Sequence, residues 1–170
     1  MTNDMSLYEK LAHYKAQGVS KTREYWHDVL GYNYRMTNIQ AAIGLAQLEK
    51  IEEKVSKKEL LGQWYQKYLK DTPLLFHIPC GDIRHTYWMC SVLARTSEER
   101  VALRKFLADN GVETRPTFPT IHKMPMYDVK DKFPVGEELS LRGINLPSYP
   151  ALEEQDVINI CNVIKEYYRK

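Results

Sequence analysis

The spacing of hydrophobic and polar residues predicts a short helix at the start of the chain. In "SLYEKLAHYKAQG", Ser6 and Glu9 form a capping box, and Gly18 can end the helix. The following stretch, residues 19–36, is polar and aromatic and shows no clear periodicity. We therefore expect a loop there.

A second, longer helix follows this loop. Thr37 and Gln40 form another capping box, and the apolar series after it has helical spacing: Ile39, Ala42, Ile43, Ala46 and Ile51. No proline occurs before Pro73, so the pattern predicts one helix from Asn38 to about Lys70. Such a helix of about 33 residues spans about 50 Å, which is longer than a small domain is wide.

From Leu74 onward the pattern changes to a mixture of strands and helices. "TYWMCSVLA" is rich in strand-forming residues, Thr96 and Gly111 bound a helix, and "VETR" resumes as a strand. "GINLPSYP" predicts a last strand or extended segment, and residues 152–168 predict a terminal helix. This part of the chain therefore reads as a small α+β domain.

Residues 1–70 contain too little to bury the apolar start of the long helix, "AAIGLAQL". Exposed apolar surface of this kind marks interfaces. We expect the first part of the chain to be the edge of something larger.

Composition excludes several classes of protein. The 170 residues have a formal net charge of only +2, which gives no basic field for nucleic acid. Cys80, Cys90 and Cys161 are far apart without a CxxC pair, so neither a zinc site nor a disulfide framework is indicated. With cysteines of this kind the chain reads as cytoplasmic. No apolar run approaches the ~18 residues of a membrane span.

The loop before the long helix is the first candidate site. Asn33 and Arg35 can both donate hydrogen bonds to a phosphate, and the N-terminus of a helix also favours anions. Alternatively, Tyr32 and Tyr34 pack while the polar pair satisfies loop carbonyls. The residues alone leave both readings open.

The segment "TRPTFPTIHKMPMY" is the second candidate. Prolines stiffen it and so lower the cost of ordering a binding loop, and its chemistry suits a phosphorylated, ring-bearing ligand: Arg115, Phe118, His122 and Met124. A structural loop with a capped histidine is the alternative. The nearby "RHTYWM" is a weaker candidate, in which the alternative is that Trp88 or Met89 is simply a core residue.

These segments together resemble the DegT/StrS family of pyridoxal-phosphate-dependent aminotransferases of keto sugar nucleotides. The resemblance covers essentially the whole chain, and its motifs are "GYNYRMTNIQAAIGLAQLEKI", "YWMCSVLA", "GVETRPTFPTIHKMPMY" and "GINLPSYPAL". It implies the α/β fold of aspartate aminotransferase. Residues 1–37 would be a remnant of the large cofactor-binding domain, 38–72 the long interdomain helix, and 73–170 the small C-terminal α+β domain with a short, mainly antiparallel sheet.

The resemblance also assigns roles to the candidate residues. Asn33, with Arg35 beside it, would reach across a dimer to the phosphate of pyridoxal 5'-phosphate. Arg115, Phe118, His122 and Met124 would line the nucleotide-sugar pocket. No catalytic residue is assigned in this chain, because the Schiff-base lysine would lie before residue 1.

The implied reaction transfers an amino group from glutamate to C4 of a 4-keto-6-deoxy sugar nucleotide, although amination at C3 and dehydration stay open. The partner would be a second copy or a complementary large-domain chain, with neither nucleic acid nor membrane involved. We expect the chain alone to be inactive. The rival reading is a noncatalytic remnant that dimerises or binds nucleotide sugar.

Overall fold

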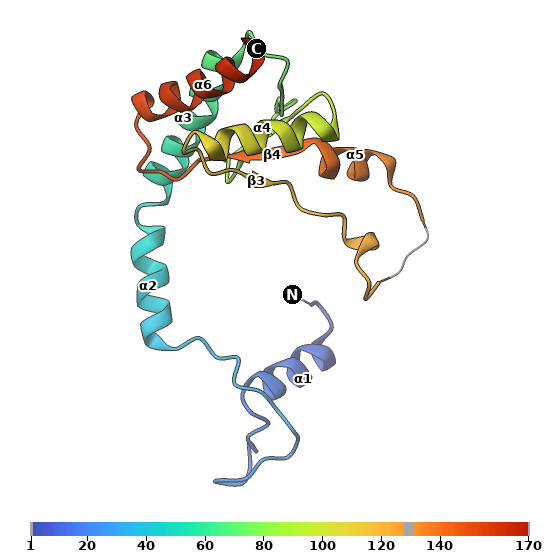
Figure 1. Cartoon of the computed structure of the whole chain (residues 1–170). Coiled ribbons are helices and arrows are strands. Elements are labelled where there is room, and N and C mark those ends of the chain that lie inside the picture. Colours follow the sequence, from blue (N-terminus) through green and yellow to red (C-terminus); the bar gives the residue numbers. More distant parts are fainter. Residues whose placement is uncertain (1, 128–130, 170) are drawn as a thin grey trace. The chain divides into compact units, whose positions relative to one another are not determined.

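The computed structural model describes residues 2–127 and 131–169, which fall into two compact units. The first unit ends at Lys50 and the second begins at Ile51. Figure 1 shows the helices and strands of both. Each unit is described by itself below.

The first unit consists of two helices joined by an irregular loop. Helix α1 spans Met5–Lys15, and the Asp4 side chain caps it by accepting a hydrogen bond from the Leu7 N–H at 3.1 Å. The predicted cap at Ser6 is therefore wrong by two residues. Helix α2 spans Asn38–Leu48, and its predicted capping box is confirmed, because both the Thr37 and the Gln40 bonds are present.

The long helix expected from residue 38 to residue 70 is interrupted. Helix α2 ends at Leu48, and helix α3 spans Ile51–Leu69. The Lys50 N–H donates to the Gln47 carbonyl at 3.3 Å, which tightens the backbone at the break. Neither proline nor glycine stands at residues 48–51, so no helix-breaking residue marks this break.

The second unit contains a four-stranded antiparallel sheet in the order β1-β2-β4-β3. Its strands are β1 (Leu75–Phe76), β2 (Cys90–Leu93), β3 (Arg115–Pro116) and β4 (Gly143–Leu146). The expected small antiparallel sheet is confirmed. The strands predicted at residues 86–94 and 112–115 are shorter in the structure. Before β2, Tyr87 has a left-handed φ of 46°, which interrupts extended backbone.

Helices α3, α4 (Ser97–Asp109), α5 (Pro134–Arg142) and α6 (Glu154–Arg169) accompany this sheet, with a short 3₁₀ turn, η1, at Ile121–Lys123. Helix α5 was not predicted. Helices α3 and α6 pack together, as Figure 1 shows. They close a core with residues of α4 and the sheet: Leu61, Tyr65, Leu69, Val92, Leu103, Leu107, Ile144, Val157 and Ile164.

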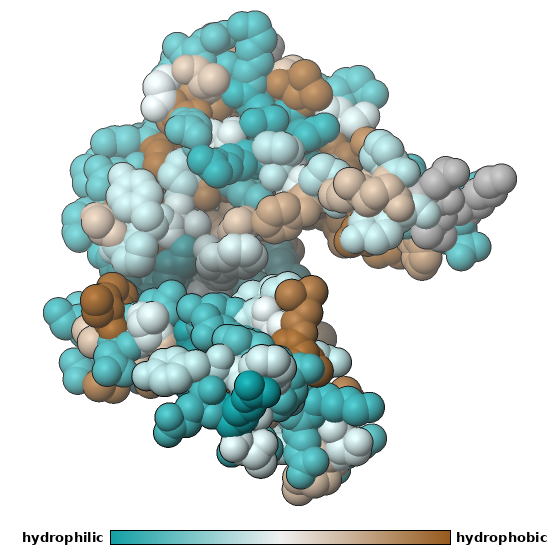
Figure 2. Space-filling view, turned by 90° about the horizontal axis from the view of Figure 1, so that it is seen from below, coloured by the Kyte–Doolittle hydropathy of each residue, from teal (hydrophilic) through white to brown (hydrophobic). Residues whose placement is uncertain are grey.

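The hydrophobic core lies in the second unit, whereas all residues of α2 are exposed in this chain. Ile39 is 74% exposed and Ile43 is 61% exposed. Hydrophobic side chains are accordingly visible at the surface in Figure 2. The apolar start of the long helix, which we expected this chain to leave unburied, is exposed in the part of the chain that the structure describes. Among the same residues, no helix has the length and apolarity that crossing a bilayer requires.

Candidate functional site

In the loop between α1 and α2, Asn33 forms an isolated antiparallel bridge with Ala16 at the end of α1. The Tyr32 N–H donates to the Tyr14 carbonyl at 2.7 Å, and the Tyr34 N–H donates to the Lys15 carbonyl at 3.1 Å. Gly31 permits this close approach, because a Cβ there would lie 2.3 Å from the Gly18 nitrogen. The segment is therefore fixed against the end of α1.

The aromatic and the polar side chains of this segment have different neighbours. The rings of Tyr32 and Tyr34 stack on each other, with centroids 5.5 Å apart and planes 10° apart. Asn33 and Arg35 instead line a cavity of about 120 Å³ together with Ala16, Gln17 and Val19. The two residues predicted to bind phosphate thus share one cavity, and the two aromatic residues form a separate stack.

The alternative reading, in which Asn33 and Arg35 satisfy loop carbonyls, is not what the structure shows. Within residues 2–127 and 131–169, neither side chain makes a hydrogen bond or an ion pair. Both residues are exposed. The two residues line one cavity, and an amide and a guanidinium are both hydrogen-bond donors that an oxyanion can accept from.

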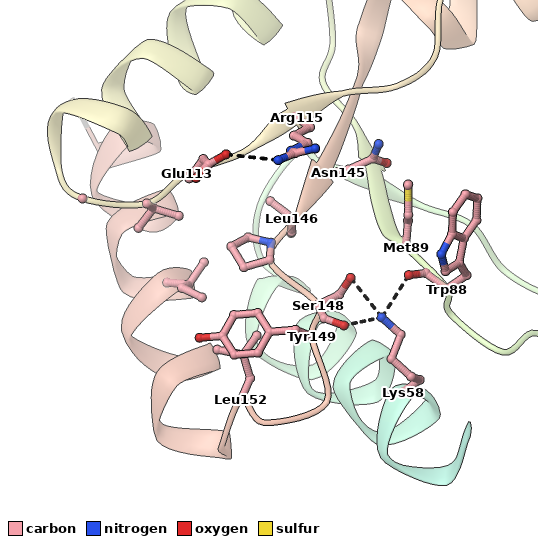
Figure 3. A pocket seen from close by; sticks show the side chains of 14 residues that line it. Lys58, Trp88, Met89, Glu113, Arg115, Asn145, Leu146, Ser148, Tyr149 and Leu152 are labelled. Atoms are coloured by element: carbon pink, nitrogen blue, oxygen red, sulfur yellow. Dashed lines mark hydrogen bonds and ion pairs between the residues drawn. The ribbon is translucent and has the colours of Figure 1, made fainter. Parts of the chain in front are cut away.

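The second unit has a larger cavity, of about 670 Å³, between the sheet and helices α3 and α6 (Figure 3). Its lining is largely apolar and includes Val112, Leu146, Leu152 and Ile160. Arg115 lines it from β3 and is paired only at 3.7 Å with Glu113. Because the Arg115 side chain is 79% exposed, that weak pair leaves its guanidinium available to an anion.

Lys58 reaches this cavity from α3 and joins two distant segments of the chain. Its ammonium donates to the Trp88 carbonyl at 2.9 Å, to the Ser148 hydroxyl at 3.2 Å, and to the Ser148 carbonyl (Figure 3). Burial lowers the pKa of Lys58. Because its ammonium is hydrogen-bonded to these oxygens, Lys58 holds the backbone at Trp88 and Ser148 in place beside the cavity.

A neighbouring cavity of about 380 Å³ shares three residues with the larger one: Trp88, Met89 and Asn145. Phe118 lines it, and its ring lies nearly parallel to Trp88, with centroids 6.3 Å apart and planes 21° apart. Trp88 is 71% exposed. The alternative in which Trp88 is a core residue is therefore not what the structure shows.

His122 and Met124 do not line either of these two cavities. His122 Nε2 lies 3.0 Å from Glu137 Oε1 on α5, and its ring contacts Phe133. Lys123 also donates to Glu137. These bonds, with that of Lys123 foremost, lower the pKa of Glu137 to about 2. In this chain His122 therefore ties the loop to α5, whereas Met124 is half-buried.

Sequence reasoning missed the cavity residues that come from outside the two candidate loops: Lys58, Asn145, Ser148 and Tyr149. Lys58 lies in a stretch of α3 that is rich in Lys and Glu, so its sequence context suggests solvent. Asn145 is held at both ends of its amide, by Ser91 at 2.6 Å and by the Pro116 carbonyl at 3.2 Å. Only the sheet pairing brings these partners together.

The sequence profile of the DegT/DnrJ/EryC1/StrS aminotransferase family matches residues 1–165, and the chain belongs to this family. It is 52% identical to GDP-perosamine synthase of Escherichia coli O157:H7, over 99% of this chain and 46% of that protein. It is 39% identical to GDP-perosamine synthase of Vibrio cholerae, over 99% of this chain and 47% of that protein. The chain spans about half the length of these relatives.

Solved structures agree with this assignment. A DegT DnrJ EryC1 StrS aminotransferase from Brucella abortus superposes with a TM-score of 0.81 at 27% identity, covering 100% of this chain and 46% of that one. Helicobacter pylori PseC, an aminotransferase involved in the biosynthesis of pseudoaminic acid, gives a TM-score of 0.84 at 22% identity, over 99% of this chain and 47% of that one, and supports the fold. The resemblance and fold expected from the sequence are confirmed.

Proposed function

We propose that this chain supplies the C-terminal half of a pyridoxal-phosphate-dependent aminotransferase that converts GDP-4-keto-6-deoxymannose to GDP-perosamine with glutamate as amino donor. The product serves O-antigen and lipopolysaccharide sugar biosynthesis. The observation that carries this proposal is the 52% identity to an Escherichia coli GDP-perosamine synthase over 99% of the chain. The matched region includes both candidate loops.

Asn33 and Arg35 are the residues of this chain that we assign to the cofactor. Both residues line one cavity of about 120 Å³, and backbone hydrogen bonds of Tyr32 and Tyr34 hold this segment against the end of α1. When bound, pyridoxal 5'-phosphate supplies the electron-withdrawing ring that makes amino transfer possible. Asn33 and Arg35 would hold its phosphate through charge-assisted hydrogen bonds and so orient the ring.

Arg115 and Phe118 are the residues we assign to the nucleotide sugar, since they line adjoining cavities. Arg115 would neutralise a phosphate, and Phe118 would offer an aromatic face. His122 and Met124 stay in this proposal as residues of the same loop, with His122 fixing that loop through Glu137.

The remaining parts of the site would come from a complementary large-domain chain or from a second copy of the whole enzyme. The exposed apolar surface of α2 supports such a partner. We propose a cytoplasmic location, in keeping with three free cysteines.

A chimera tests this function. The corresponding C-terminal part of the Escherichia coli GDP-perosamine synthase is replaced by these 170 residues, and the purified chimera is given pyridoxal phosphate, glutamate and GDP-4-keto-6-deoxymannose. We expect glutamate-dependent GDP-perosamine by mass spectrometry, and no product from the 170-residue chain alone.

A folded, cofactor-binding chimera that makes no aminated product would refute the proposed function. It would favour the noncatalytic reading, in which the chain dimerises or binds nucleotide sugar. Turnover by the 170-residue chain alone would contradict the expectation that it needs the other half.

A further inference from the structure

We propose that Trp88 and Phe118 together form a stacking platform for the purine base of the nucleotide, so that Trp88 is a binding residue for the nucleotide sugar. This inference rests on the proposed function and deepens it. It begins from an unusual exposure: Trp88 is 71% exposed and Phe118 is 64% exposed in the described chain. Large aromatic surfaces of this kind favour burial against a partner.

The position of the two rings points to a ligand in the adjoining cavities. Trp88 lines both the 670 Å³ and the 380 Å³ cavity, and Phe118 lines the smaller one. Their planes are only 21° apart, so they present nearly parallel faces. A planar, electron-rich base stacks on such faces regardless of its hydrogen-bonding edge.

The backbone on both sides of the platform is fixed. The Lys58 ammonium holds the Trp88 carbonyl at 2.9 Å. On the other side, the Thr117 N–H donates to the Gly143 carbonyl at 3.2 Å, and the Thr117 hydroxyl donates to the Leu139 carbonyl at 3.0 Å. Two rings anchored to a helix and a sheet lose little freedom when a ligand binds, which favours affinity.

The surrounding charges suit a nucleoside diphosphate. Arg115, weakly paired, lines the larger cavity beside Trp88. Arg84 lines the smaller one, but its guanidinium is engaged by Glu59 at 2.6 Å and Glu52 at 3.3 Å. The platform would therefore hold the base while Arg115 holds a phosphate.

Titration of the full chain with GDP, followed by tryptophan fluorescence and calorimetry, tests this inference. We expect saturable binding, with quenching that disappears in Trp88→Phe. Trp88→Leu should weaken GDP binding by about 10-fold or more, because stacking on one aromatic ring contributes about 1–3 kcal/mol. Trp88→Phe keeps an aromatic face and should lose at most a few-fold.

Two controls separate stacking from general damage. Trp26→Phe replaces another exposed tryptophan, one that lines neither cavity, and should leave GDP affinity unchanged. Pyrophosphate, which lacks a base, should bind equally to wild type and Trp88→Leu. Circular dichroism checks that each variant is folded.

Unchanged GDP affinity in a folded Trp88→Leu variant, equal losses for GDP and pyrophosphate, or failure of the wild-type chain to bind GDP at millimolar concentration would each overturn the platform. None of these outcomes bears on amino transfer by the chimera. The proposed function and this inference therefore fail separately.

Discussion

Replacing Gly62 with alanine probes how tightly the segment before β2 packs on α3. A Cβ at Gly62 would lie 2.5 Å from Tyr87 Cδ1 and 2.6 Å from Tyr87 Cε1. Tyr87 cannot easily retreat, because its hydroxyl accepts a bond from Gln66 at 3.0 Å and its N–H donates to His85 Nδ1 at 3.1 Å. Gly62 is itself buried in α3.

Two opposing effects decide the sign of the change. Alanine in place of glycine inside a helix stabilises it by about 1 kcal/mol. Overpacking costs about 1–3 kcal/mol, and losing the Gln66–Tyr87 hydrogen bond costs about 1 kcal/mol more. We therefore expect Gly62→Ala to lower the free energy of unfolding of the second unit by about 1–3 kcal/mol.

Urea unfolding followed by tryptophan fluorescence measures this loss. In a Trp26→Phe background, the two remaining tryptophans, Trp64 and Trp88, both lie in the second unit. Gly136→Ala is the matched control, because a Cβ there meets only Thr120 Cγ2 at an ordinary 3.8 Å. This change should not lower the free energy of unfolding.

The Tyr87 ring itself supplies the second control for this prediction. In a Tyr87→Ala background the clash is gone, so Gly62→Ala should be neutral or stabilising. A Gly62→Ala protein as stable as wild type would refute the packing argument.

Three further outcomes follow. Tyr65→Phe should destabilise the second unit by about 1–2 kcal/mol in the same urea assay, because the buried Tyr65 hydroxyl donates to the Pro147 carbonyl at 2.7 Å. Glu137→Gln should be less stable than wild type above pH 4.5, because the bonds that lower the pKa of Glu137 stabilise the fold only while its carboxylate is ionised. The difference in melting temperature should therefore shrink as the pH falls from 4.5 to 2. In the chimera, Asn33→Ala and Arg35→Ala should each weaken pyridoxal phosphate binding by about 10-fold or more, measured by cofactor absorbance in equilibrium dialysis; unchanged affinity would contradict the phosphate assignment.

Local signals in the sequence were enough to predict the elements with strong end markers. The capping box at Thr37, the helix from Thr96 to Gly111 and the terminal helix are all present. These features depend on contacts within a few residues, which a single sequence can specify.

The remaining features depend on contacts between distant residues. The break between α2 and α3 has no proline or glycine to mark it. The exposure of Trp88 follows from the left-handed backbone at Tyr87, whose ring packs on Gly62. His122 is hydrogen-bonded to Glu137 on α5, and the sequence pattern did not predict this helix. Sequence periodicity carries none of this information.

The most direct test of the account is isotopic. The chimera is supplied with ¹⁵N-glutamate, pyridoxal phosphate and GDP-4-keto-6-deoxymannose, and the product is examined by mass spectrometry. The account predicts an aminated nucleotide sugar that carries the heavy nitrogen, and loss of this product when Asn33 and Arg35 are both replaced by alanine. An active chimera whose product carries no heavy nitrogen would contradict the account. So would a double-alanine variant at Asn33 and Arg35 that makes as much labelled product as the unsubstituted chimera.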